Sequence, residues 1–391
     1  MLAFTFPGQG SQRPGMGTAW ADHPSWELVD EASQVAGRDI GRLLLEADAD
    51  ELKQTRNAQL TTFLASLVVL DAVERVGVVP GVCAGHSLGE YTALVATGAL
   101  SFTDGVAIVT ERGDAMNEAA EDNPGTMAAV LGLDDDDVDA ACRRAEGEVW
   151  VANFNAPGQV VIAGGVDAVA RAGEIAKELG AKKVMALPVS GAFHTPYMAQ
   201  ARDRLKKAIA SATIRPPDVP VVANIDARPH TDPEEWGQLL SAQLTSPVRW
   251  RQTIQRLTDD GVDTLAEVGP GSVLTGMAKR ITPSTRTVTV ATPDDLDHLL
   301  EVLSGELPVQ IAPGEHLYMH ERLVVSPGAG LFQLDGRWQG DHDGTAVEVG
   351  TLIGRVGDHE VRSLFAGELM SFVAVDGERV TSAQPIAWLR T

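Results

Sequence analysis

The chain has 391 residues, 44% of them hydrophobic, and is long enough for two or three globular domains. Its 31 Lys and Arg against 54 Asp and Glu give a formal net charge of −23, which disfavours nucleic acid and anionic membrane surfaces as partners. Two cysteines are too few for a disulfide framework or a zinc site, and neither a signal peptide nor a membrane span is evident, so we expect a cytoplasmic protein.

The N-terminal segment predicts a strand at residues 2–6 that runs into the loop Pro7-Gly8-Gln9-Gly10-Ser11-Gln12. This loop is rich in backbone N–H groups. It is not a dinucleotide-binding fingerprint, because that pattern needs glycine at position 13, where Arg13 stands. It also lacks the Lys-Ser/Thr pair of a P-loop. Apolar residues at helical spacing then predict helices over residues 24–36, 48–55 and 61–76, the last of them almost fully buried.

Residues 78–93 contain the pattern on which the functional argument depends. An apolar run leads into Gly85-His86-Ser87-Leu88-Gly89, and an alanine-rich helical segment follows. A serine at such a strand-to-helix turn is exposed in a strained conformation, and the positive end of the helix dipole faces it. Ser87 is therefore the candidate nucleophile. A chance match in a glycine-rich chain is the alternative, and the pattern alone does not say which acyl chemistry follows.

Residues 125–189 predict a small inserted subdomain. Its elements are strands at 127–133, 149–154, 159–163 and 183–188 and helices at 134–145 and 166–179, with a turn at 155–158. Strand, helix, strand, strand, helix, strand is the ferredoxin-like order. Residues 1–124 and 190–304 form the large subdomain around it.

The second part of the large subdomain alternates strands with helices. The strands are expected at 219–223, 264–268 and 287–290, and the helices at 196–212, 234–244, after the loop 243–250, from 271 through 280, and at 294–303. This alternation predicts an α/β fold with a largely parallel sheet covered on both faces.

A linker is expected at residues 305–321, where Pro308 and Pro313 bracket a polar segment, and the helical periodicity disappears beyond it. Residues 322–391 predict a small all-β module. Its β-rich runs are 324–325, 347–349, 351–356, 368–375 and 385–389.

A nucleophilic serine needs a base, and nine histidines are available. His194 follows a predicted strand and has small neighbours that leave its ring accessible. His86 is disfavoured, because the side chains of adjacent residues at a strand-to-helix turn, here His86 and Ser87, point in different directions. No aspartate is evident as a third member. Arg112, on a helix predicted over residues 102–120, is either a solvated residue or one directed at the site.

Six stretches in chain order resemble the malonyl-CoA:acyl carrier protein transacylase family over residues 1–303. They are FPGQGSQ (6–12), GHSLGEY (85–91), ERG (111–113), NFNAPGQVVIAG (153–164), PVSGAFH (188–194) and EVGPGSVLTGMAKRI (267–281). The resemblance implies an α/β-hydrolase-like large subdomain with a parallel sheet, and a Ser-His dyad. Ser87 would carry the malonyl ester and His194 would act as base.

The resemblance also implies roles for neighbouring groups. The main-chain carbonyl of Gln243 would orient the imidazole, which removes the need for an aspartate. Backbone N–H groups of Gln9 and Leu88 would form the oxyanion hole. Arg112 would bind the malonyl carboxylate through a bidentate pair, which a planar guanidinium allows. Phe193 would narrow the space at the acyl carbon and favour malonyl over methylmalonyl as a tendency.

Two further residues match polar positions of the family, Asn155 and Gln59, and their roles stay open. Leu60 stands where the family usually has proline.

The implied reaction transfers malonyl from malonyl-CoA to the phosphopantetheine thiol of an acyl carrier protein by a ping-pong mechanism, in fatty-acid or polyketide synthesis. CoA thioesters are substrates, and no metal or permanently bound cofactor is expected. The alternatives are a thioesterase on the same scaffold and a catalytically idle scaffold. Carrier proteins are acidic, so a basic patch would be needed to dock one, although a solvated helix face is the better explanation of any single candidate residue. The candidates are Arg171, Lys177, Lys182 and Lys183, or Arg202, Arg204, Lys206 and Lys207.

Residues 323–390 resemble a biotinyl/lipoyl carrier domain in LVVSPGAGLF (323–332), VEVGTLIGRVG (347–357) and the stretch 361–389. Such domains carry a lysine on the central hairpin. Here the hairpin is Arg355-Val356-Gly357-Asp358-His359-Glu360, and no lysine follows Lys279. We therefore expect no biotin or lipoate, and a module that serves protein interaction or self-association.

Overall fold

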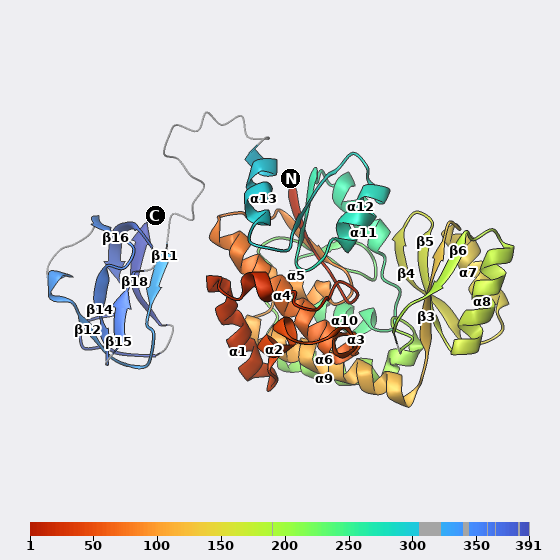
Figure 1. The fold of residues 1–391 in the computed structure, drawn as a ribbon, viewed down its shortest axis with the longest axis horizontal. Helices are drawn as coiled ribbons and strands as arrows, with labels where there is room; N and C mark the ends of the chain where they lie inside the picture. The colour runs from red at the N-terminus through yellow and green to blue at the C-terminus, as the bar shows by residue number, and fades with distance from the viewer. Residues whose placement is uncertain are drawn as a thin grey trace. The chain divides into compact units, whose positions relative to one another are not determined.

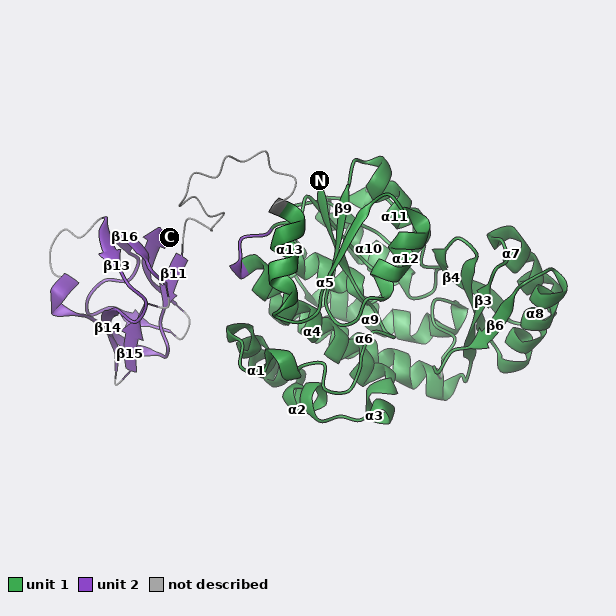
Figure 2. Ribbon diagram, turned by 45° about the horizontal axis from the view of Figure 1, so that its top comes forward, with its two compact units in different colours: residues 1–74, 79–308 green, residues 75–78, 309–391 purple. Residues whose placement is uncertain are grey.

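The computed structural model of the chain describes residues 1–189, 191–304, 322–338, 344–357, 359–363, 365–381 and 384–390. It divides into two compact units, residues 1–74 with 79–308, and residues 75–78 with 309–391 (Figure 2). The expected linker at 305–321, and Asp358 of the expected hairpin, lie outside the described residues. No helix in the described part of the chain is long and apolar enough to cross a membrane.

The larger unit is built around a six-stranded sheet in the order β10-β9-β1-β2-β7-β8 (Figure 1). Its strands are β1 (Leu2–Phe6), β2 (Val82–Gly85), β7 (Val221–Val222), β8 (Pro229–His230), β9 (Thr264–Val268) and β10 (Arg286–Val290). All neighbouring pairs are parallel except β7 with β8, which form an antiparallel edge. The predicted α/β core is therefore confirmed, and β8 is a strand that the sequence pattern did not predict.

Helices enclose this sheet. They are α1 (Glu27–Ala36), α2 (Ile40–Leu45), α3 (Ala49–Lys53), α4 (Thr55–Arg75), α5 (Gly89–Ala96), α6 (Phe102–Asp122), α9 (Ala199–Ser211), α10 (Pro233–Gln243), α11 (Trp250–Asp259), α12 (Val273–Ile281) and α13 (Asp295–Ser304). Side chains of α11 and α12 form one core cluster with Ala3, Ala84 and Leu265 of the sheet, while α5 packs on β1 and β2.

The helical predictions were wrong in three details near the N-terminus. Helix α2 was not predicted, and the expected helix over 48–55 ends early, because Gln54 leaves the helical region with a ψ of 126°. Helix α4 then begins at Thr55 rather than at residue 61. Asp48 starts α3 by accepting hydrogen bonds from the N–H groups of Asp50 and Glu51.

Three adjacent strands end at one edge of the sheet. Strand β1 ends at Phe6, β2 at Gly85 and β9 at Val268, and the order β9-β1-β2 makes them neighbours. Since the carboxyl ends of parallel strands share an edge, the loops that follow must meet there. Those loops are the Gly8-Gln9 segment, the turn at Ser87 and the Gly269-Pro270-Gly271 turn.

Glycines allow these loops to pack against one another. A Cβ on Gly85 would lie 1.9 Å from the carbonyl carbon of Gly89, and a Cβ on Gly89 would lie 2.1 Å from the carbonyl oxygen of Phe6. A Cβ on Gly8 would lie 2.4 Å from the carbonyl oxygen of His86. No side chain fits at these distances, so the turn that presents Ser87 requires glycine at all three positions.

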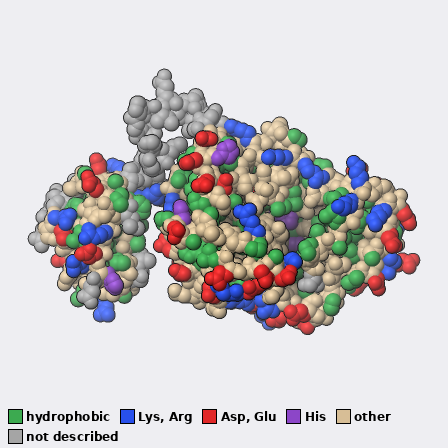
Figure 3. Space-filling model, viewed as in Figure 1, with side chains coloured by type: hydrophobic (Ala, Val, Ile, Leu, Met, Phe, Trp, Pro, Cys, Tyr) green, Lys and Arg blue, Asp and Glu red, His purple; other side chains and the backbone are tan. Residues whose placement is uncertain are grey.

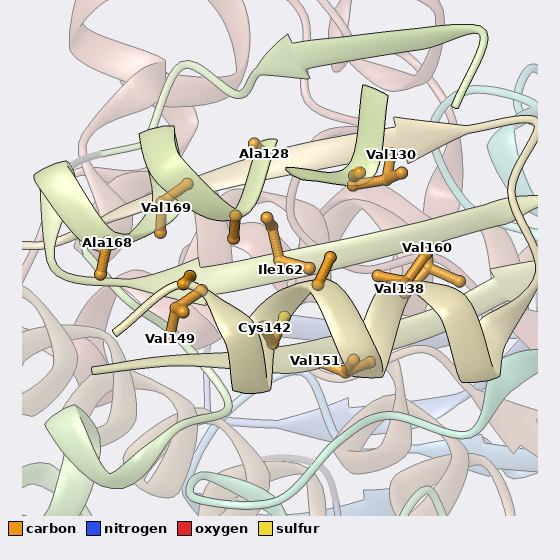
Figure 4. Packing of buried hydrophobic residues seen from close by; sticks show 14 of the residues in the cluster. Ala128, Val130, Val138, Cys142, Val149, Val151, Val160, Ile162, Ala168 and Val169 are labelled. Carbon is orange, nitrogen blue, oxygen red and sulfur yellow. The ribbon is translucent and has the colours of Figure 1, made fainter. Parts of the chain in front are cut away.

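Residues 126–186 form the small subdomain. Its elements are β3 (Thr126–Leu131), α7 (Asp135–Arg144), β4 (Val149–Ala156), β5 (Gln159–Gly164), α8 (Val166–Glu178) and β6 (Lys183–Ala186). The sheet order is β4-β5-β3-β6 with antiparallel neighbours, the arrangement expected of a ferredoxin-like fold. Both helices pack on the sheet around Val130, Val138, Val160 and Ile162 (Figure 4).

One detail of this subdomain was predicted wrongly. Asn155 and Ala156 belong to β4 and not to a turn, because Ala156 pairs with Gln159 and leaves only Pro157-Gly158 to close the hairpin.

The small subdomain is fixed to the large one through β4. The Phe154 N–H donates to the Val248 carbonyl, and the Val248 N–H donates to the Ala152 carbonyl, both at 2.9 Å. Arg251 on α11 pairs with Asp135 on α7, with 2.9 Å between Nη1 and Oδ1. These bonds hold β4 against the large subdomain.

The second unit is all-β. Its described strands form two four-stranded sheets, β11-β18-β16-β13 and β15-β14-β12-β17. The strands are β11 (Arg322–Val325), β12 (Gly330–Leu334), β13 (Thr345–Val347), β14 (Leu352–Val356), β15 (His359–Arg362), β16 (Gly367–Phe372), β17 (Arg379–Val380) and β18 (Pro385–Arg390). Phe332, Ile353 and Ile386 lie at the centre of the core between them.

The β-rich runs missed β12, β15 and β17. Strand β15 has a single buried side chain, Val361, and β17 is only two residues long. Such strands carry too little apolar alternation to be read from the sequence.

Candidate active site

A cavity of about 160 Å³ lies between the two subdomains at the carboxyl ends of β1 and β2. Its lining includes Ser87, Arg112 and His194, together with Asn153 and Asn155 of β4. The site therefore depends on both subdomains being closed on each other.

Ser87 and His194 are within hydrogen-bond distance. His194 Nε2 lies 2.8 Å from Ser87 Oγ, and His194 Nδ1 lies 2.9 Å from the carbonyl oxygen of Gln243. Because a carbonyl only accepts, Nδ1 carries the proton and Nε2 is left to accept the serine hydroxyl. The structure thus places the backbone of Gln243 where a Ser-His-Asp triad has its acid.

Both residues of this pair have a left-handed backbone. Ser87 has a φ of 52° and His194 a φ of 61°, in a region that non-glycine residues rarely adopt. Backbone strain of this kind persists when surrounding contacts over-determine it, as they do at the glycine-packed turn.

Arg112 is 1% exposed and reaches the nucleophile from α6. Its Nη2 lies 3.1 Å from Ser87 Oγ and 3.0 Å from Gln243 Oε1, and its Nη1 donates to Gln59 Oε1. Within the described part of the chain no Asp or Glu forms an ion pair with it, and its Nε has no hydrogen-bond partner. The site therefore contains a buried cation whose direct contacts are all neutral.

Two polar residues to which the sequence analysis gave no role, Glu90 and Asn224, complete the hydrogen-bond network around Ser87. The Gln243 side chain donates from Nε2 to the Ser87 carbonyl at 2.8 Å and to Glu90, and Asn224 accepts from the Ser87 N–H at 2.7 Å. Glu90 lies within GHSLGEY, and a carboxylate in an apolar helix was the available signal. Asn224 gave no sequence signal, because its loop looks like an ordinary polar turn.

Of the remaining predicted residues, all but Leu88 line the cavity. His86 points away from Ser87 and its Nε2 bonds to Asn155 Oδ1 at 2.9 Å, so Asn155 orients His86. Gln59 contacts Arg112, and Phe193 is buried in the wall. Gln9 lies in the lining, and Leu88 immediately precedes α5, with a fully buried side chain.

Burial controls the charge of His194. It lowers the pKa of this residue to about 3, and the nearby Arg112 charge adds to the effect. Burial lowers the pKa of His86 as well. Both imidazoles are therefore neutral near pH 7, as a base that accepts the serine proton must be.

Comparisons with known proteins agree with this geometry. The acyl transferase domain family matches residues 3–293. The malonyl CoA-acyl carrier protein transacylase of Bacillus subtilis (strain 168) is 41% identical over 310 residues, which cover 78% of this chain and 98% of that protein. The chain belongs to this transacylase family. The resemblance inferred from the six sequence stretches is thus confirmed.

Solved structures of the family have the same fold. The acyl-carrier-protein S-malonyltransferase of Burkholderia pseudomallei 1710b is 44% identical and superposes with a TM-score of 0.75, covering 77% of this chain and 99% of that chain. A malonyl-transacylase in complex with its type II polyketide acyl-carrier protein is 39% identical, with a TM-score of 0.75 over 77% of this chain and 99% of that chain.

We predict that His194 remains neutral through the physiological range. Its folded pKa of about 3 lies below the unfolded value of 6.5, so the associated stability is present above pH 6.5 and is lost as pH falls toward 3. Histidine NMR, assigned with His194→Gln, should show no His194 midpoint between about pH 5 and 8.

His230 is the internal control for this measurement. Burial lowers its pKa, but hydrogen bonds to Glu235 and Asp226 outweigh burial and raise the pKa overall. It should titrate above 6.5. A His194 midpoint close to that of a free imidazole would contradict the prediction.

Proposed function

We propose that this chain transfers malonyl from malonyl-CoA to the phosphopantetheine thiol of an acyl carrier protein. The observation that carries the proposal is the buried Arg112 guanidinium 3.1 Å from the Ser87 hydroxyl, without an ion-pair partner among the described residues. A buried, unpaired cation is unfavourable until an anion binds it. A malonyl carboxylate would supply that anion and leave the thioester carbonyl at Ser87.

The first half-reaction uses the Ser87-His194 pair. His194 Nε2 takes the hydroxyl proton as Ser87 Oγ attacks the thioester carbon, and the Gln243 carbonyl stabilises the imidazolium that forms. Collapse of the tetrahedral intermediate breaks the carbon–sulfur bond, and His194 returns the proton to the CoA thiolate. The product is a malonyl ester on Ser87.

Backbone N–H groups of Gln9 and Leu88 would hold the oxyanion of that intermediate. The Leu88 N–H belongs to the residue that follows the nucleophile and immediately precedes α5, a position from which a backbone donor would reach the oxyanion. The Gly8-Gln9 loop packs on the His86 carbonyl closely enough to exclude a Cβ, which supports its place beside the acyl carbon.

The second half-reaction brings the carrier thiol to the same ester, again with His194 as base. Docking of an acidic carrier needs basic groups near the cavity. Figure 3 shows Lys and Arg side chains over the region of α11, α12 and the adjacent small subdomain, while Asp and Glu gather along the lower edge. Lys182 and Lys183, at the start of β6 in the small subdomain, are exposed, whereas Arg204 is paired with Glu111 and Glu118.

The proposal also covers the C-terminal module, the subdomain boundaries and the cellular location. The two β-sheets of the second unit support a biotinyl/lipoyl-like module, and its β14–β15 hairpin lacks a lysine to modify. The family match ends at residue 293, so this module is an addition that would serve protein interaction or self-association. The subdomain boundaries at 124/125 and 189/190 and a cytoplasmic location belong to the proposal as well.

Intact mass spectrometry tests the reaction directly. Mixing with malonyl-CoA should add one malonyl group to the enzyme, and holo-carrier should remove it. Ser87→Ala should show no adduct, while Ser211→Ala, an exposed serine on α9, should behave as wild type. Loss of the adduct to water alone, at a rate independent of carrier, would instead indicate a thioesterase.

Replacing Arg112 tests the carboxylate role. Arg112→Ala should lower kcat/KM for malonyl-CoA by about 100-fold, since a bidentate charged pair contributes about 3 kcal/mol. Use of acetyl-CoA, which has no carboxylate, should stay equal or improve. Arg204→Ala is the matched control, because that arginine pairs with Glu111 and Glu118 away from the cavity. An equal loss for both substrates would refute the role.

Deleting residues 306–391 tests the module. The Bacillus subtilis relative is covered almost completely without it, so the shortened enzyme should fold and form the malonyl ester at the wild-type rate. We expect weaker carrier transfer or a smaller oligomer, measured by steady-state kinetics and light scattering. Unchanged carrier kinetics together with an unchanged oligomeric state would exclude the interaction role.

A further inference from the structure

Glu90 is a buried carboxylate immediately behind the nucleophile. It lies in the first turn of α5, three residues after Ser87, and is 1% exposed. It neither lines the cavity nor contacts Ser87 Oγ. A buried carboxylate is costly to retain unless its oxygens are satisfied by hydrogen bonds, and both of them are.

The two oxygens of Glu90 hold two distant segments. Oε1 accepts the backbone N–H of Asn224 at 2.7 Å, and Oε2 accepts the Gln243 Nε2–H. Asn224 in turn accepts the Ser87 N–H and donates from Nδ2 to the Gly85 carbonyl at 2.7 Å. One carboxylate therefore links the turn at Ser87, the loop after β7 and the end of α10.

The direction of these hydrogen bonds decides how the Gln243 amide is oriented. An ionised carboxylate only accepts, so Gln243 must turn its NH2 group toward Glu90 and the Ser87 carbonyl. Gln243 Oε1 is then left to accept from Arg112 Nη2. If the amide were reversed, its NH2 would meet the guanidinium donor to donor, and its oxygen would meet the Ser87 carbonyl.

We propose that Glu90 is a positioning residue that sets the hydrogen-bond polarity of Gln243 and thereby holds Arg112 in place for an acyl carboxylate. The inference rests on the proposed malonyl transfer and adds a determinant of its specificity. Glu90 acts through Gln243 and touches neither substrate nor reacting atoms.

The protonation of Glu90 bears on this role. Burial raises the pKa of Glu90 to about 7, although its hydrogen bonds from Asn224 and Gln243 oppose the rise. The charged groups that face it are Arg112 from α6 and Asp226 from the loop after β7. Protonation would turn one acceptor oxygen into a donor and favour the reversed amide. His194 and His86 have lowered pKa values and stay neutral in this range.

Glu90→Gln is the discriminating variant. Its single amide oxygen can accept from the Asn224 N–H, but its NH2 group then faces the NH2 group of Gln243, which must reverse. The experiment measures formation of the Ser87 ester from malonyl-CoA and from acetyl-CoA, by single-turnover mass spectrometry. Half-saturation for malonyl-CoA should rise about tenfold or more, while that for acetyl-CoA should change less than about threefold. As the pH falls from about 8 to 6, the malonyl-CoA concentration at half-saturation should rise for the wild-type enzyme and stay constant for Glu90→Gln.

Ser101→Ala is the matched control. Ser101 Oγ accepts the Asp104 N–H and caps α6, the helix that carries Arg112, and the cap lies outside the cavity lining. Its loss should lower the unfolding temperature without separating the two acyl-CoAs.

Equal losses for both acyl-CoAs in Glu90→Gln, or no change in either, would overturn the inference. A wild-type enzyme that forms no malonyl ester would overturn the proposed function itself, so the two failures can be told apart.

Discussion

Contact between backbones at the ends of β1 and β2 is the constraint on which the rest of the structure depends. Gly8, Gly85 and Gly89 allow three chain segments to approach within distances that exclude any Cβ. This packing forces Ser87 into a left-handed conformation and fixes the start of α5. The N–H groups around the serine are then held in place before substrate arrives, which is how preorganised oxyanion sites lower a barrier. Substrate binding need not reshape the turn.

A second requirement is to keep a cation buried beside that turn. Arg112 is held by neutral oxygens of Gln59, Gln243 and Ser87 and stacks on the Tyr91 ring at 5.2 Å. Neutral partners keep the guanidinium in position without neutralising it, so its charge remains available to a ligand. The same residue, Gln243, serves His194 with its backbone and Arg112 with its side chain. In the proposed reaction, acid–base chemistry and carboxylate recognition would therefore depend on the same residue.

The sequence was sufficient for the elements whose signal is local. Alternating strands and helices predicted the α/β core, and GHSLG with a strand before it predicted the turn at Ser87. His194 was reached by elimination, and its acceptor at Gln243 only through family resemblance. The roles of Glu90 and Asn224 could not be read locally, because each depends on a partner more than a hundred residues away. The break between α3 and α4 was predicted too late in the chain, and the short strands β15 and β17 were missed for lack of apolar periodicity.

Long sequence separation at the site has a consequence for folding. Strand β1 (Leu2–Phe6) pairs with β2 (Val82–Gly85) on one side and with the much later β9 (Thr264–Val268) on the other. The small subdomain lies between Ser87 and His194 in the chain, and the two side chains meet in the folded unit. Contacts of this kind slow folding, because the loop-closure entropy is lost before the contact forms. A nascent chain that has been synthesised only as far as the turn at Ser87 still lacks His194, the Gln243 carbonyl and β9. Under the proposed mechanism, Ser87 would stay without its base until the larger unit has closed, so a partly folded chain would not consume acyl-CoA.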